Sequence, residues 1–221
     1  MKNLHNALLL KQLYQLRELG YKYTDTKPFS HQEQNPLELP NTLKELKYQA
    51  NNCHLCSLSK SRTKVVFGEG DENANIMFVG DFPLEMEDDA GKPFLGRGGE
   101  MLTAMIEKVL TLSRQNVYVT NLLKCRPLQG QALHETPFHT CKAYLFKEIE
   151  IIKPKIVITL GEEVYHYLSN DTGDFKTLRG TVIDAKDYLI VPTYHPNFLL
   201  KNPSLKKEVF IDLKKVKSLL S

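Results

Sequence analysis

The chain has 221 residues, of which 42% are hydrophobic and 25% are charged, and this composition is typical of a globular protein with one sizeable core. The formal net charge of +3 at pH 7 is compatible with a nucleic-acid partner but does not by itself indicate one. No apolar run is long enough to span a membrane, and the run at residues 7–10 is too short for a secretory signal. We therefore expect a soluble, cytoplasmic, monomeric protein with no membrane partner.

The N-terminal part of the chain is predicted to be an appendage. Apolar positions at helical spacing predict an amphipathic helix over residues 4–19. Residues 24–40 are polar and contain three prolines, which favours a linker, and a second helix is predicted over residues 42–51. We therefore expect an N-terminal helix and linker at 1–40 and the main domain at 41–221.

Short β-branched runs alternate with helical patterns beyond this point. Strands are predicted at 76–79, 117–120, 156–160 and 188–191, and helices at 100–112, 138–152, 162–168 and 205–219. Alternation of this kind predicts an α/β fold of three α/β/α layers, with a central, largely parallel, four-stranded sheet.

The four cysteines form two pairs along the sequence. Two residues separate Cys53 from Cys56, and fifteen separate Cys125 from Cys141. In a reducing cytosol such a set favours metal ligation over disulfides. Structural zinc sites commonly pair two short Cys-x-x-Cys turns, whereas only the first pair is short here. The spacing therefore favours an iron-sulfur cluster over zinc, with buried inert thiols as a third alternative.

Chemically versatile side chains follow three of the predicted strands. They are Asp81, Asn121 and His195. Ligands of open parallel sheets bind at the carboxyl ends of the strands. An amide can read the edge of a base, and an imidazole can stabilise an anion or move a proton. Each residue alone has a structural explanation as a cap, a turn or a loop residue, but their joint placement favours a site.

A set of motifs surrounds these residues. They are Cys53-His54-Leu55-Cys56, Gly80-Asp81-Phe82-Pro83, the segment 91–97, the segment 120–127, Cys141, Leu178-Arg179-Gly180, the segment 193–197 and Lys201-Asn202-Pro203. In this order and spacing the chain resembles the family 4, iron-sulfur uracil-DNA glycosylases, which are also similar to a domain of some phage DNA polymerases. The resemblance covers about residues 43–219. It implies an enzyme that hydrolyses the N-glycosidic bond of uracil in single- or double-stranded DNA, leaving an abasic site in base-excision repair.

The resemblance also implies a cofactor and catalytic roles. It implies a [4Fe–4S] cluster held by the four cysteines. Asp81 matches the catalytic carboxylate, which positions water or offsets positive charge on the sugar. His195 matches the histidine that stabilises the departing uracil anion.

Further matches concern recognition of the base. Phe94 matches the aromatic residue that stacks on the base, and Asn121 matches the amide that pairs with the uracil edge. Glu87 lies where the family closes the pocket against the methyl group of thymine. Core packing of Phe94 and a solvated loop carboxylate at Glu87 remain as alternatives.

DNA binding is expected to involve residues around the pocket. Lys124, Arg126, Arg179 and Lys201 are predicted to meet phosphates. Apolar residues after His195, among them Leu199 and Leu200, are predicted to wedge into the duplex, with burial beneath the last helix as the alternative.

The first motif departs from the family pattern, which is commonly Glu, a small residue and Pro-Gly. Here Asp81 is one methylene shorter than the usual Glu, and Phe82 is bulky where the family's small residue lets the backbone approach the base. The basic, His-containing insertion of the covalent uracil-trapping relatives has no counterpart between Gly96 and Met101. Two alternatives therefore stay open. One is a catalytically altered or inactive DNA-binding iron-sulfur relative with a different base specificity, and the other is a zinc or iron-sulfur α/β protein of redox chemistry.

Overall fold

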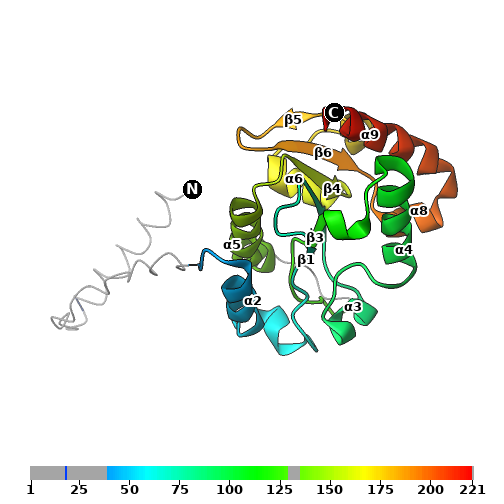
Figure 1. The fold of residues 1–221 in the computed structure, drawn as a ribbon. Coiled ribbons are helices and arrows are strands. Elements are labelled where there is room, and N and C mark those ends of the chain that lie inside the picture. Colours follow the sequence, from blue (N-terminus) through cyan, green and yellow to red (C-terminus); the bar gives the residue numbers. More distant parts are fainter. Residues whose placement is uncertain (1–17, 19–38, 129–134, 221) are drawn as a thin grey trace. The chain divides into compact units, whose positions relative to one another are not determined.

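The computed structural model describes residues 18, 39–128 and 135–220 (Figure 1). The chain divides into two units, Met1–Glu38 and Leu39–Ser221, and nearly all described residues belong to the second. The predicted helix over residues 4–19 and most of the predicted linker lie outside the described residues. Within the described part, no helix is long and apolar enough to cross a membrane.

A six-stranded sheet of order β1-β3-β2-β4-β6-β5 forms the centre of the second unit. The strands are β1 (Glu69–Gly70), β2 (Ile76–Gly80), β3 (Tyr118–Asn121), β4 (Ile156–Leu160), β5 (Ile183–Asp184) and β6 (Leu189–Thr193). The four central strands are parallel, as predicted. The prediction of four strands missed β1 and β5, which pair antiparallel at the two edges. Each has only two residues, which is too short to show a strand period.

The central strands are apolar because both faces of the sheet are covered. Every residue of β2 and of β4 is buried, and a parallel sheet enclosed on both sides favours such continuous runs. Figure 1 shows α5 on one side of the sheet and α4, α8 and α9 on the other. This is the predicted three-layer α/β/α arrangement.

Eight α-helices lie in the described residues. They are α2 (Leu43–Asn51), α3 (Glu85–Ala90), α4 (Gly96–Met105), α5 (Glu135–Ile152), α6 (Glu162–Ser169), α7 (Phe175–Leu178), α8 (Pro196–Lys201) and α9 (Lys206–Leu219). The long helices α2, α5, α6 and α9 agree with the prediction to within a few residues. The prediction missed α3, α7 and α8, because a helix of four to six residues is too short to show an apolar stripe.

Helix α4 begins four residues earlier than predicted and ends in a different geometry. Its first turn contains Gly98 and Gly99, whose low helix propensity placed the predicted start at Glu100. The helix then continues as a π-helical turn, Ile106–Leu110, which packs beside α9. The start of α4 lies directly after Phe94, so this helix fixes one wall of the site.

Candidate active site at the carboxyl ends of the strands

The register of the sheet brings three predicted site residues to one edge. Gly80 at the end of β2 is level with Asn121 at the end of β3. Leu160 at the end of β4 is level with Thr193 at the end of β6. Because these strands run in the same direction, Asp81, Asn121 and His195 all follow at the same edge.

Asn121 carries an unpaired donor at this edge. The residue is only 2% exposed, and its Nδ2 is buried without a hydrogen-bond partner in the part of the chain that the structure describes. A Cβ atom added to Gly80 would lie 2.5 Å from Asn121 Oδ1 and 2.6 Å from Phe94 Cζ. The glycine is therefore required, and the amide and the aromatic ring converge over the end of β2. A buried donor left without a partner costs about 1–3 kcal/mol, so this atom is best explained by a ligand.

His195 is fixed by the start of α8. The backbone N–H of Asn197 donates to its Nδ1 at 3.1 Å, so the neutral ring carries its proton on Nε2. Burial lowers the pKa of His195 from its ordinary value of 6.5, although the charge of Asp81 opposes this effect. The imidazole is therefore a neutral donor near pH 7. Its ring stacks on Phe94, with 5.7 Å between the centroids and 28° between the planes.

Asp81 follows β2 directly and faces His195. Its Oδ1 accepts the backbone N–H of Phe82 at 2.8 Å and lies 3.7 Å from His195 Nε2. The second distance is too long for a hydrogen bond, so the Nε2–H of His195 is not used by Asp81. The Asp81 side chain is 31% exposed, which leaves the carboxylate accessible to water.

Phe94 has a strained backbone that neighbouring groups hold. Its φ angle is 54°, which is rare for an aromatic residue. Its carbonyl approaches Gly99 so closely that no Cβ atom would fit there. Such strain persists where the surroundings impose it, and it is frequent in ligand sites.

Glu87 supports the same loop from beneath. Its carboxylate accepts the backbone N–H groups of Leu84 at 2.7 Å and of Leu95 at 3.2 Å. The residue is 6% exposed, and burial raises its pKa. Glu87 is thus not the solvated loop carboxylate that the sequence left open. Phe82 is half-buried and packs against the core, and its side chain stays a predicted contact of the base.

The four cysteines meet at a second place. All four are free, and together they line one small cavity. Arg62 Nη1 donates to the sulfur of Cys125 at 3.3 Å. No group of three His, Cys, Asp or Glu side chains in the described residues has the geometry of a single-ion site. Four thiols around one enclosed space fit a multi-iron cluster by their donor type and number.

Two predicted DNA contacts are corrected by burial. Lys124 is 2% exposed, and its ammonium forms an ion pair of 2.6 Å with Glu148, so it does not reach a phosphate. Leu199 is 1% exposed because it faces inward from α8. It is therefore buried, which was the alternative to the predicted wedge into the duplex. The exposed apolar residue of this helix is Phe198, at 43%.

The remaining predicted DNA contacts differ in their exposure and in whether a carboxylate of the protein already pairs with them. Arg179 forms ion pairs with Glu208 at 2.8 Å and with Asp212, so its charge is already compensated inside the protein. Arg126 pairs with the exposed Glu85 at 3.3 Å. Lys201 is exposed and Leu200 is half-buried. Arg126, Lys201 and Leu200 stay predicted DNA contacts.

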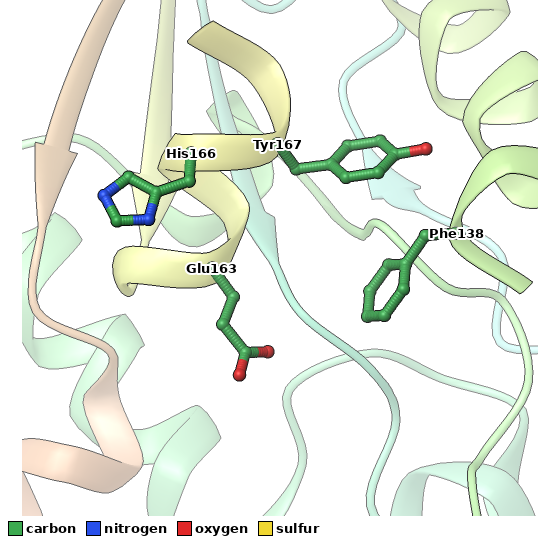
Figure 2. A pocket seen from close by; sticks show the side chains of 4 residues that line it. All are labelled: Phe138, Glu163, His166 and Tyr167. Atoms are coloured by element: carbon green, nitrogen blue, oxygen red, sulfur yellow. The ribbon is translucent and has the colours of Figure 1, made fainter. Parts of the chain in front are cut away.

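A pocket lined by α5 and α6 contains a carboxylate that sequence reasoning missed. Figure 2 shows Glu163 of α6 and Phe138 of α5 pointing into the same space, with Tyr167 beside Phe138 and His166 turned away. Partial burial raises the pKa of Glu163, and the charge of Asp81 adds to this effect. Glu163 therefore lies within electrostatic range of the catalytic candidate. Its position shortly after β4 was the signal that could have identified it.

The model of the uracil DNA glycosylase superfamily matches residues 67–214, a span that contains the strand-end site and the second cysteine pair. The chain belongs to this superfamily.

Similar proteins show to which family of this superfamily the chain belongs. A type-4 uracil-DNA glycosylase of Sulfurisphaera tokodaii is 39% identical over 188 residues, covering 80% of this chain and 84% of the relative. A type-4 enzyme of Saccharolobus solfataricus is 40% identical over 181 residues, covering 78% and 84%. One of Thermotoga maritima is 35% identical over 176 residues, covering 78% and 91%. The chain is thus a member of the type-4 family, as its motifs predicted.

Proposed function

We propose that the protein removes uracil from DNA by hydrolysing its N-glycosidic bond. The observation that carries this proposal is the unpartnered Nδ2 of Asn121, buried beside Phe94 at the strand ends. An enzyme that acts on a base in DNA must take the base out of the stack and read its Watson–Crick edge in a pocket. An unpaired donor beside an aromatic ring is suited to that reading.

Asn121 distinguishes uracil from cytosine in this proposal. Its Nδ2 donates to O4 of uracil, and its Oδ1 accepts N3–H. Cytosine presents the opposite donor and acceptor pattern at these two positions, so it leaves both groups of the amide unpaired. Phe94 stacks on the flat face of the base and holds its edge toward Asn121. Glu87 keeps this loop in place through the N–H groups of Leu84 and Leu95.

His195 and Asp81 carry the bond cleavage. As the glycosidic bond breaks, negative charge develops on the uracil and positive charge on the sugar. The neutral Nε2–H of His195 donates to the departing uracil oxygen, while the Asp81 carboxylate offsets the sugar charge and orients the attacking water. Both groups are preorganised, since Asn197 fixes the imidazole and Phe82 N–H fixes the carboxylate.

Four cysteines would hold a [4Fe–4S] cluster in this proposal: Cys53, Cys56, Cys125 and Cys141. They lie after α2, after β3 and on α5, so the cluster would supply a structural link between these segments. Protein purified without oxygen should contain about four irons per chain. One zinc and no iron would contradict this assignment.

In this proposal the protein binds DNA through residues around the opening of the base pocket. Arg126 and Lys201 meet phosphates, and Leu200 with the exposed Phe198 enters the duplex as the base leaves. Residues 41–221 form the glycosylase unit, and residues 1–40 are an appendage to it. A truncated protein lacking residues 1–40 should therefore retain uracil release.

The direct test uses purified protein and oligonucleotides carrying one uracil, both single-stranded and duplex. Excision leaves an abasic site that alkali cleaves, so the product is a shortened strand. The matched control carries thymine at the same position and should remain intact. Absence of cleavage in both uracil substrates would overturn the proposal.

The altered first motif favours a second candidate, a DNA-binding relative with different base specificity. Phe82 replaces a small residue directly beside Asp81 and is half-buried against the core. The double variant Asp81→Glu/Phe82→Gly restores the usual family residues. If uracil removal is the natural activity, this variant excises at the wild-type rate or faster. An inert wild type with activity only in the double variant would favour the second candidate.

A further inference from the structure

Lys124 is a buried cation whose donors are all used. Its Nζ donates to Glu148 Oε2 at 2.6 Å, to Thr120 Oγ1 at 2.6 Å and to the backbone carbonyl of Asn121 at 2.7 Å. The side chains of Lys124 and Glu148 are 2% and 0% exposed. One of the three contacts is thus made to Asn121, whose buried side-chain amide carries the proposed base reading.

Fold stability alone gives no reason for this arrangement. A buried ion pair replaced by apolar residues of similar volume is often neutral or stabilising. Glu148 is itself fixed, since it accepts Tyr118 O–H at 3.2 Å and the N–H of Gly68 at 3.4 Å. The ammonium of Lys124 is therefore held at a defined position beneath β3.

The same contacts control how Asn121 is presented. Asn121 is the last residue of β3, and the chain then turns. The N–H groups of Leu122 and Leu123 donate to the carbonyls of Gly80 and Asp81, at 2.8 Å and 2.9 Å. These bonds hold the far side of the turn, and Lys124 holds the carbonyl at its beginning. The direction of the Asn121 side chain depends on both.

Lys124 also forms part of the wall of the four-cysteine cavity. It precedes Cys125, and its backbone N–H hydrogen-bonds to Cys141. The residue therefore contacts the cavity through its backbone and the pocket through its side chain.

We infer that Lys124, paired with Glu148, is a positioning residue that sets the Asn121 amide for base reading and links the pocket to the cysteine cavity. The inference rests on the proposed function. It assigns to Lys124 a role in base recognition in place of the phosphate contact expected from the sequence.

The test removes both charges together, because Lys124→Met alone would leave Glu148 buried and unpaired. In the variant Lys124→Met/Glu148→Gln, inhibition by free uracil and single-turnover excision should each weaken about tenfold or more. Affinity for duplex DNA carrying an abasic site should stay within about twofold, since the DNA surface is unchanged. Amide hydrogen exchange at residues 121–123 should become faster. The matched control is Lys147→Met/Glu150→Gln, which removes a 2.8 Å ion pair on α5 together with the bond from Lys147 to Asn41, and it should leave every readout unchanged.

The outcomes separate this inference from the proposed function. If the wild-type protein releases no uracil, the proposed function is overturned. Amide hydrogen exchange at residues 121–123, compared between the wild type and the charge-free variant, still tests whether Lys124 positions Asn121. Unchanged uracil inhibition and exchange in the charge-free variant overturn the inference while the function stands. A parallel loss of abasic-site binding and thermal midpoint also overturns it, because that result indicates a purely structural pair.

Discussion

Two polar residues three positions apart, Asn121 and Lys124, have opposite hydrogen-bonding states. Both are 2% exposed. Among the described residues the Asn121 Nδ2 has no partner, whereas the Lys124 ammonium has three. An unpaired buried donor destabilises the fold by about 1–3 kcal/mol unless a ligand satisfies it. The unpaired donor of Asn121 is thus free to meet a ligand at the strand ends, whereas the fully paired Lys124 belongs to the scaffold behind it.

The largest expected effect is at the unsatisfied amide. Asn121→Ala removes both the donor and the acceptor for the uracil edge, so single-turnover excision should fall about a thousandfold. The control Asn52→Ala removes an exposed amide that donates to the carbonyl of Tyr48, and it should excise at the wild-type rate. Equal rates for the two variants would contradict the edge-reading role.

The next effect concerns the departing base. His195→Ala removes a donor whose bond strengthens only as uracil becomes anionic, so turnover should fall about a hundredfold while DNA affinity changes only a few-fold. His139→Ala removes an exposed imidazole of α5 and serves as the control. A similar loss in binding and in turnover would instead identify His195 as a DNA contact.

The protonation state of His195 gives a smaller and more specific effect. Because burial lowers its pKa, the NMR titration of this ring should have its midpoint below 6.5. The unfolded chain binds the proton first as the pH falls below 6.5, so this group lowers stability progressively between 6.5 and its folded pKa. His195→Asn should therefore reduce the acid sensitivity of the thermal midpoint in that range. A midpoint above 6.5 would contradict the neutral-donor role.

The smallest effect is expected at the edge of the pocket. Glu163 has a raised pKa, so its ionised form is less favourable in the folded protein than in the unfolded chain. Its cost to stability is absent below its ordinary value of 4.5 and grows as the pH rises through the folded pKa. Glu163→Gln should slightly raise the thermal midpoint near pH 7, and the gain should vanish in acid. The control is Glu107→Gln, at an exposed glutamate of the π-helical turn after α4.

Much of the fold was predictable because its signals are local. The runs that became β2, β3, β4 and β6 are mostly apolar, which is the pattern of a parallel sheet covered on both faces. Short elements such as β1 and α3 were missed because they carry no period of their own. The strand-end rule identified Asp81, Asn121 and His195, since it depends only on where each strand ends.

The layers, the family and the residue types at the strand ends can be predicted from the sequence alone. Which polar groups find a hydrogen-bond partner depends on how the chain packs. Lys124 and Arg126 both looked like phosphate contacts, but Lys124 turns inward to Glu148 while Arg126 stays near the surface. Glu148 lies on a helix distant in sequence, and its carboxylate meets Lys124 only when α5 packs on the sheet. The partner of a buried charge depends on long-range packing, and a linear pattern does not contain that information.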